Sequence, residues 1–284
     1  MARIGLQVMT VREEFTRLGT YEALKQIAEI GFRNLELSQV SMAPENVAEM
    51  ERAKGDLGLE FSAISAPLDA PEGADSLSGT MDKIISDAKR LGAPFVRIGM
   101  MAPEAMRSRE TIVDYSKRAD EAAKQLADEG ITLCYHNHHV EFARIDGQFI
   151  LDLIRETAPN LRYEIDLHWV HRGGLEPIRF LKQYDGVVDL VHLKDYRIGL
   201  LGDEAFEAYD KKDIGAFMQH FLGVVQFAEV GEGNLDFPAM IAAAEEVGAK
   251  HLYVEQDATY GRAPFEALQL SHDNLVKMGF QDKF

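Results

Sequence analysis

The chain has 284 residues, of which 46% are hydrophobic, and 30 Lys and Arg against 47 Asp and Glu give a formal net charge of 30 − 47 = −17. This length fits one α/β barrel or two average domains. The negative charge repels phosphate backbones and anionic lipid, so we expect no nucleic-acid partner and no membrane partner. The single cysteine, Cys134, excludes an internal disulfide, and the N-terminus lacks the apolar run of a signal peptide. These features predict a cytoplasmic enzyme.

Short apolar runs alternate with amphipathic stretches of helical length along the whole chain. The predicted strands span Ile4–Met9, Arg33–Ser38, Leu59–Ser65, Phe95–Met100, Ile131–His136, Leu161–Asp166, Val187–Lys194 and His251–Gln256. The predicted helices span Thr20–Ile30, Pro44–Leu57, Ser76–Leu91, Arg109–Glu129, Phe149–Thr157, Leu175–Tyr184 and Phe237–Val247. This repetition of strand and helix predicts a single-domain (β/α)8 TIM barrel over residues 1–284.

One segment interrupts the alternation. Residues 198–234 are too many for an ordinary loop between a strand and a helix, and Glu204–His220 within them has a helical pattern. We therefore predict an ordered insertion over one end of the barrel. An active-site lid and a subunit contact in a homo-oligomer both fit this insertion.

Polar side chains recur near the carboxyl ends of the predicted strands. They share one alternating parity within each strand and comprise Gln7, Glu36, His136, His138, Glu164, Asp166, His168, His192, Lys194, Glu255 and Asp257. Because residues two apart in a strand share a face, the apolar parity suits contact with the helices and the polar parity should point into the barrel. TIM barrels build their active sites at this carboxyl end.

Three of these residues lie on consecutive predicted strands and can converge on one point. Asp166, His192 and Glu255 offer two carboxylates and one imidazole, which suit one divalent ion such as Mn²⁺, Mg²⁺, Co²⁺ or Zn²⁺. A single such residue at a strand end is usually a surface or hydrogen-bonded group. The repetition of the pattern on four adjacent strands favours a metal site, whose fourth ligand should come from strand five.

Several segments resemble a known family. HNHHVEF (136–142), EIDLHWV (164–170), VHLKD (191–195), VGEGNLDFP (230–238) and YVEQD (253–257) are similar to segments of the sugar phosphate isomerase/epimerase superfamily, and the resemblance covers essentially the whole chain. Its members are xylose-isomerase-like TIM barrels that include inosose dehydratases and ketose 3-epimerases. The resemblance implies a metal held by Glu, Asp, His and Glu from strands five to eight, and Asp166, His192 and Glu255 match the last three.

Strand five departs from the family pattern. Where the family has its glutamate, this chain has Leu133 or Cys134, and the nearest carboxylate is Glu141. Strict alternation gives Glu141 the wrong parity, which a bulge or turn after Asn137 would correct. Glu141 is our first choice for the fourth ligand, and His138 and His136 are the alternatives.

The resemblance also implies an activity. Such enzymes act beside a carbonyl, so we predict a metal-dependent isomerase or epimerase that converts a sugar or cyclitol through an enediolate. A dehydratase or a C-glycoside deglycosidase would begin with the same proton abstraction. Glu255 is the expected base, with a strand-five group such as Glu141 as the alternative.

We expect further catalytic roles for three histidines and one lysine. His136, His138 and His168 are candidate proton carriers, because imidazole titrates near neutral pH. Lys194 would bind a hydroxyl or a developing negative charge, or simply pair with Asp166 or Glu255.

The remaining motifs weigh against rival functions. There is no P-loop, and VGEGN is too short and too acidic for a phosphate cradle. A nuclease of the endonuclease IV type would need a multi-zinc cluster and basic DNA-binding loops, which a chain of charge −17 does not favour. The other alternative to a metal-dependent enzyme is a catalytically inactive barrel that serves as a binding subunit. The absence of the family's glutamate from strand five favours this alternative.

Overall fold

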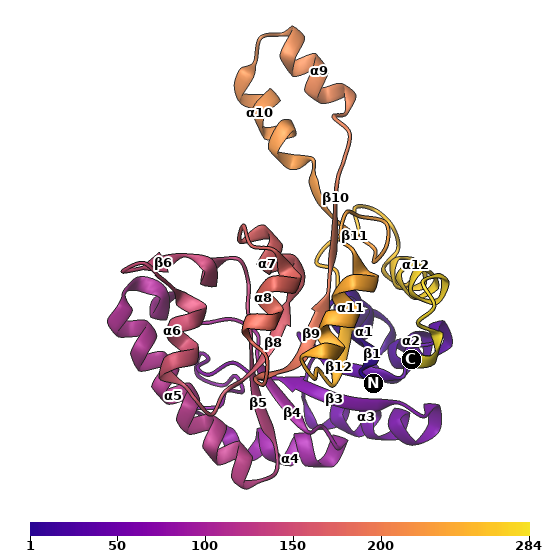
Figure 1. The fold of residues 1–284 in the computed structure, drawn as a ribbon. Helices are drawn as coiled ribbons and strands as arrows, with labels where there is room; N and C mark the ends of the chain where they lie inside the picture. Colours follow the sequence, from indigo (N-terminus) through magenta and orange to yellow (C-terminus); the bar gives the residue numbers. More distant parts are fainter.

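The computed structural model describes all 284 residues and contains a closed barrel of eight parallel strands (Figure 1). Around the barrel the order is β1 (Arg3–Gln7), β12 (His251–Val254), β9 (Val188–Leu193), β8 (Arg162–Asp166), β5 (Thr132–His136), β4 (Phe95–Ile98), β3 (Glu60–Ser65) and β2 (Asn34–Leu37). The predicted (β/α)8 TIM barrel is confirmed, and a barrel strand is present at each predicted position, although β1 begins one residue before and ends two residues before the predicted Ile4–Met9.

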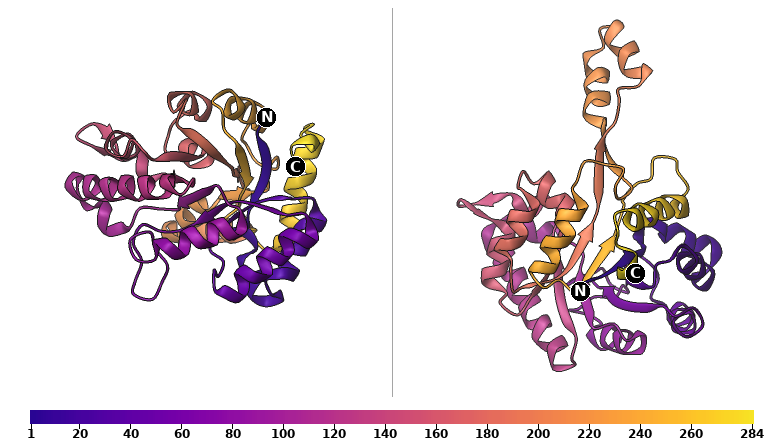
Figure 2. Two further views of the ribbon diagram at one scale, coloured as in Figure 1. Left: turned by 90° about the horizontal axis from the view of Figure 1, so that it is seen from below. Right: turned by 45° about the vertical axis from the view of Figure 1, so that its right-hand side comes forward.

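Helices cover the outside of the barrel (Figures 1 and 2). They are α2 (Thr20–Ile30), α3 (Pro44–Leu57), α4 (Met81–Leu91), α5 (Arg109–Asp128), α6 (Ile150–Thr157), α8 (Pro177–Gln183), α11 (Phe237–Glu246) and α12 (Pro264–Lys277). Shorter elements are α1 (Arg12–Leu18), α7 (Leu167–Arg172), the hairpin of β6 (Arg144–Ile145) and β7 (Gln148–Phe149), and the 3-10 turns η1 (Val8–Val11), η2 (Pro103–Arg107), η3 (Val140–Phe142) and η4 (Gln281–Lys283). Helix α12 follows the last predicted strand and completes the final strand–helix unit.

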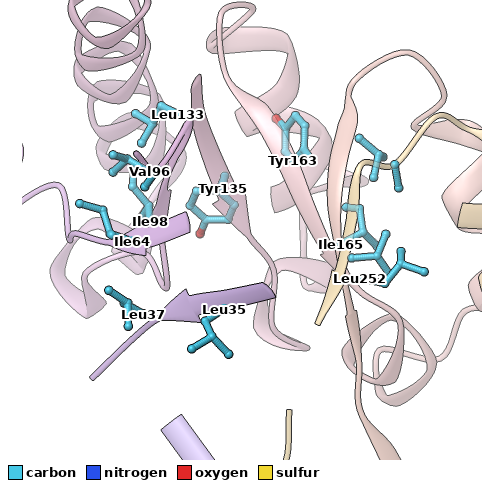
Figure 3. Packing of buried hydrophobic residues seen from close by; sticks show 14 of the residues in the cluster. Leu35, Leu37, Ile64, Val96, Ile98, Leu133, Tyr135, Tyr163, Ile165 and Leu252 are labelled. Carbon is cyan, nitrogen blue, oxygen red and sulfur yellow. The ribbon is translucent and has the colours of Figure 1, made fainter. Parts of the chain in front are cut away.

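The core has two parts that follow the alternation of side chains along the strands. A cluster of 68 buried residues fills the space around the strands and helices, and it includes Val96 and Leu133 (Figure 3). A separate cluster of 5 residues, which are Ala63, Phe95, Cys134, Leu190 and Tyr253, comes from the other parity of five strands. His136, His192 and Glu255 each lie two residues after a member of this small cluster, so alternation gives them the same face one step nearer the carboxyl end.

Two strands end earlier than the alternation of side chains in the sequence suggested. β8 stops at Asp166, and α7 begins at once, with Asp166 as its N-cap and its Oδ1 accepting a hydrogen bond from Trp169 N at 3.0 Å. The strand-six parity assigned to His168 is therefore wrong, because His168 lies on a helix. β5 likewise stops at His136, so His138 belongs to the turn that follows and not to the strand face.

The long insertion forms a projecting arm, which we define as residues 195–228. β10 (Asp195–Ile198) and β11 (Val225–Ala228) pair antiparallel as its stem, and α9 (Asp203–Asp210) and α10 (Ile214–Gly223) form its tip. The arm begins just after the carboxyl end of β9 and stands away from the barrel in Figure 1 and in the right-hand view of Figure 2.

Across the whole molecule, no helix combines the length and apolar character needed to span a lipid bilayer.

Candidate metal centre

Four side chains from four adjacent strand ends converge at the carboxyl end of the barrel. His136 ends β5, Asp166 ends β8, His192 lies in β9, and Glu255 directly follows β12. Each offers one ligand atom, and these four atoms all lie within 4.8 Å of one another. All four residues are buried. The neighbouring order β5, β8, β9, β12 in the barrel brings together residues that are up to 119 positions apart in the chain.

The hydrogen bonding of these four residues fits a cation. His136 Nδ1, Asp166 Oδ2, His192 Nδ1 and Glu255 Oε2 are all buried, and none of them makes a well-aligned hydrogen bond, although His192 Nδ1 lies 2.8 Å and Lys194 Nζ 2.9 Å from Glu255 Oε2. A buried polar atom without a well-aligned hydrogen bond is costly in an apolar environment. Two carboxylate oxygens and two imidazole nitrogens form a donor set that suits Mn²⁺, Co²⁺ or Zn²⁺. The residues present therefore fit a divalent metal ion.

The structure places Glu141 beside this group rather than in it. Glu141 Oε1 accepts a hydrogen bond from the Tyr135 hydroxyl at 2.8 Å, and Oε2 accepts one from the backbone N–H of His138 at 2.9 Å. The expected turn after Asn137 is present, but it engages both Glu141 oxygens in holding the chain between β5 and η3. Among the three candidates for the strand-five position, His136 is the one that lies within the ligand group.

A second layer of charge lies on the other side of His192, and this layer contains a residue that the sequence analysis missed. His192 Nε2 is 3.1 Å from Glu36 Oε2 and 3.2 Å from Glu164 Oε1. The buried Arg97 of β4 pairs with Glu36 and lies 3.2 Å from Glu164. Arg97 lies two residues after Phe95 and therefore points into the barrel on the same face. A charged residue at an inward position of an apolar strand was the feature of the sequence that could have identified it.

Lys194 lies against the carboxylates of the ligand group. Its Nζ is 2.9 Å from Glu255 Oε2, 3.1 Å from Asp257 Oδ2 and 3.4 Å from Asp166 Oδ2. Burial alone would lower the pKa of Lys194, but these three carboxylates raise it above its ordinary value. Lys194 therefore remains a cation at neutral pH and does not serve as a base.

The ligand group opens into a cavity of about 690 Å³, whose lining includes Arg97, His136, His138, Glu255 and Asp257. This volume lies within the range of small-molecule sites. His138 Nδ1 has no hydrogen-bond partner, and burial lowers the pKa of His138 to about 4. At neutral pH its imidazole is therefore uncharged and able to accept a proton.

His168 lies in an aromatic group behind the ligands. Its ring centroid is 4.7 Å from that of Trp169 and 5.2 Å from that of Phe227 in the arm. Both of its ring nitrogens are buried without a partner, and burial lowers the pKa of His168 to about 4. The base of the arm thus packs against His168 and Trp169.

The VGEGN loop (230–234) is occupied by a side chain of the protein itself. The Asp195 carboxylate accepts hydrogen bonds from the backbone N–H groups of Gly231 at 3.1 Å, Gly233 at 2.9 Å and Leu235 at 3.3 Å. A Cβ on Gly233 would lie only 2.3 Å from Asp195 Oδ1, so glycine is required there. The loop folds around the carboxylate of Asp195, so these N–H groups are not available to bind a phosphate.

Comparisons with known proteins agree with the barrel fold. The family model described as a xylose isomerase-like TIM barrel matches residues 24–273. A curated relative, the rhizopine catabolism protein MocC of Rhizobium meliloti, is 26% identical over 168 residues, which is 58% of this chain and 49% of MocC. The chain thus spans about half the length of that relative.

Solved structures show the same fold. A sugar phosphate isomerase/epimerase from Parabacteroides distasonis has a TM-score of 0.75 and 19% identity, covering 99% of this chain and 96% of that one. The 3-keto-D-glucoside 4-epimerase YcjR from E. coli has a TM-score of 0.65 and 14% identity, covering 98% and 99%. Together with the match to the family model, the barrel identifies this chain as a member of the xylose isomerase-like TIM barrel family.

Proposed function

We propose that this protein is a divalent-metal-dependent isomerase or epimerase that acts beside a carbonyl group of a sugar or cyclitol. The observation that carries the proposal is the convergence of four buried ligand atoms, one each from His136, Asp166, His192 and Glu255, within 4.8 Å of one another. These residues lie at the carboxyl end of a TIM barrel, where enzymes of this fold place their chemistry.

His136, Asp166, His192 and Glu255 would hold one Mn²⁺, Mg²⁺, Co²⁺ or Zn²⁺ ion. When bound, such an ion supplies positive charge for the substrate oxygens that become negative in an enediolate. The second acidic group, Glu36 and Glu164 beside His192, already has a cation in Arg97. This pairing supports one metal ion per site, and it weighs against the multi-zinc cluster of an endonuclease IV type nuclease.

Two groups at the cavity suit proton transfer. Burial would raise the pKa of Glu255, but Lys194 and His192 lower it well below its ordinary value, so Glu255 is a carboxylate at neutral pH. Neutral His138 lies on the same cavity. We assign Glu255 as the base that removes the proton from carbon, and His138 as the group that returns or relays it. The cationic Lys194 would stabilise the negative charge that develops on a substrate oxygen.

The polar lining of the cavity supports a hydroxylated substrate. Ser38, Gln39 and Ser65 offer hydroxyl and amide groups, and Asp75 and Asp257 offer carboxylates. The carboxylates of Asp75, Asp257 and Glu255 would repel a phosphate group. Because the N–H groups of the VGEGN loop are bound to Asp195, we assign an unphosphorylated sugar or cyclitol as the substrate.

Proton transfer to carbon is tested by solvent exchange. The metal-loaded enzyme is incubated in D2O with a panel of ketoses and inososes, and the products are analysed by NMR and mass spectrometry. We expect deuterium at the carbon beside the carbonyl, and we expect its incorporation to stop when the metal is chelated. His138→Asn should retain the metal and slow the exchange.

A different outcome would change the assignment. Product formed without solvent deuterium, together with a requirement for a second equivalent of metal, would indicate a hydride shift and contradict this mechanism. Deuterium incorporation accompanied by loss of water from the substrate would identify a dehydratase that begins with the same step.

A further inference from the structure

Helix α10 of the arm is largely apolar and is exposed. Its ten residues, IGAFMQHFLG, contain no Asp, Glu, Lys or Arg, and none of them is buried. A helix this apolar is normally found inside a protein core or an interface. Helix α9 is the neighbour of α10 in the arm, but it leaves every residue of α10 at least partly exposed.

Within the arm, the contacts leave most of the apolar surface open. The two buried residues of α9 are the small Ala205 and Ala208, and the rings of Tyr209 and Phe217 lie 5.5 Å apart. The large apolar side chains that remain exposed in the arm are Ile198, Leu200, Phe206, Tyr209, Ile214, Met218, Phe221 and Leu222. Of these, Leu200 is 97% and Leu222 is 68% exposed.

We propose that the exposed apolar side chains of the arm, centred on α10, form a dimerisation surface and that its occupant is the arm of a second copy of this chain. The three exposed aromatic rings of the arm are 49–59% exposed. With about 150–250 Å² for a buried aromatic side chain, and a similar total from the five aliphatic side chains, each arm offers roughly 600 Å² of apolar surface. Two arms would bury roughly 1,200 Å², which reaches the area of a stable interface.

The distribution of charge selects the arm of the partner over its barrel. Two chains of net charge −17 repel each other over most of their surfaces. Helix α9 carries Asp203, Glu204, Glu207 and Asp210, whereas α10 carries no carboxylate. Two copies therefore meet at least electrostatic cost when α10 faces α10. A twofold axis between the arms makes this contact self-complementary and assembles two helical hairpins into a four-helix bundle.

The pairing is independent of the proposed chemistry, because it rests on the surface of the arm and not on the metal ligands. The arm nevertheless contacts residues near the metal ligands. Phe227, at the base of the arm in β11, packs against the rings of His168 and Trp169. Association through the arm would therefore hold the base of the arm against His168 and Trp169.

The experiment measures mass in solution by analytical ultracentrifugation. Over about 1–100 µM the wild-type chain should sediment as a dimer of the 31.8 kDa protomer. Phe221→Glu combined with Leu222→Glu should raise the dimer dissociation constant by roughly 100-fold or more, because both copies lose apolar contacts. Lys211→Glu changes charge at the exposed end of α9 and is the matched control, which should remain dimeric.

A second variant removes the tip of the arm altogether. Ile198 pairs with Val225 in the stem, so residues 199–224 can be replaced by an Asn-Gly turn without disturbing the barrel. This variant should be monomeric with the circular dichroism and melting behaviour of a folded barrel. The proposal would be overturned if the wild-type chain remained monomeric over this concentration range, whether it was free in solution or bound to lipid vesicles through the arm. So would a dimer that survives removal of residues 199–224.

Discussion

His192 Nε2 lies 3.1 Å from Glu36 Oε2, while Nδ1 of the same imidazole lies 2.8 Å from Glu255 Oε2. The Glu36 carboxylate can therefore accept a hydrogen bond from the Nε2–H group of His192. This bond leaves Nδ1 as the unprotonated nitrogen that faces the candidate metal position. Carboxylates that hold metal-bound histidines in this way fix the tautomer and the ring orientation. Arg97 balances the charge of Glu36, so the barrel interior supports His192 from β2 and β4.

The first prediction concerns metal content. Asp166→Ala, His192→Ala and Glu255→Ala should each reduce bound metal from about one equivalent to nearly none, because each variant removes one of the four donor atoms that would hold the ion. Metal is measured by inductively coupled plasma mass spectrometry after dialysis, and circular dichroism checks the fold. A full equivalent of metal in any two of these variants would contradict the site.

The second prediction separates His136 from Glu141. His136→Ala should weaken metal binding by more than the roughly 10–100-fold typical of residues that only orient a ligand. Glu141→Gln should keep the metal and lower the free energy of unfolding by ~1–3 kcal/mol, because a buried carboxylate that accepts two hydrogen bonds is lost. Metal titration and urea unfolding measure the two effects. Loss of metal from the Glu141 variant alone would assign the fourth ligand to Glu141.

The third prediction concerns the buried cation. Arg97→Met leaves Glu36 and Glu164 without their counter-charge, and it should lower the free energy of unfolding by ~3–5 kcal/mol. Adding Glu36→Gln should recover part of the loss, since one of the unpaired charges is removed. Arg118→Met, which breaks an exposed pair with Asp69, is the control and should cost at most ~1 kcal/mol. Equal losses for the two arginines in urea unfolding would contradict the role of Arg97.

The fourth prediction concerns acid stability. Burial lowers the pKa of His251 to about 4, and Asn34 Nδ2 lies 2.9 Å from its Nδ1. The folded protein thus favours neutral His251, whereas the unfolded chain binds the proton with a pKa near 6.5. The stabilisation is complete above pH 6.5 and is lost as the pH falls to 4, by ~1–3 kcal/mol for this partly exposed ring.

His251→Gln removes that proton-binding group, so the difference in unfolding free energy between pH 7 and pH 4 should shrink by this amount. Thermal or urea unfolding at a series of pH values measures it. An unchanged slope in the His251 variant would show that this imidazole does not contribute.

Much of the fold was predictable because it depends on spacing within single segments. The alternation of apolar and polar residues in ITLCYH places Cys134 and His136 on one face whatever the rest of the chain does. The same holds for Leu190 with His192 and for Tyr253 with Glu255. These local patterns, repeated along the chain, indicated both the barrel and the inward face of its site.

Residues beyond the strand ends were less predictable. His168 was assigned by strand alternation, but Asp166 caps a helix at that point and changes the direction of every later side chain. Glu141 and His136 are five positions apart across a turn, so only the folded path of residues 137–141 shows which of them reaches the ligand group.

The sequence alone therefore determined the barrel, the face of each strand that points inward and three members of the site, because all of these follow from short-range periodicity. Tertiary structure alone decided that Arg97 lies beneath the site, that Asp195 occupies the VGEGN loop and that the arm stands away from the barrel. Each depends on contacts between segments that are 30 or more residues apart, such as the 36 positions between Asp195 and Gly231. The distance and direction of such contacts are set by the closure of the barrel, which no local pattern contains.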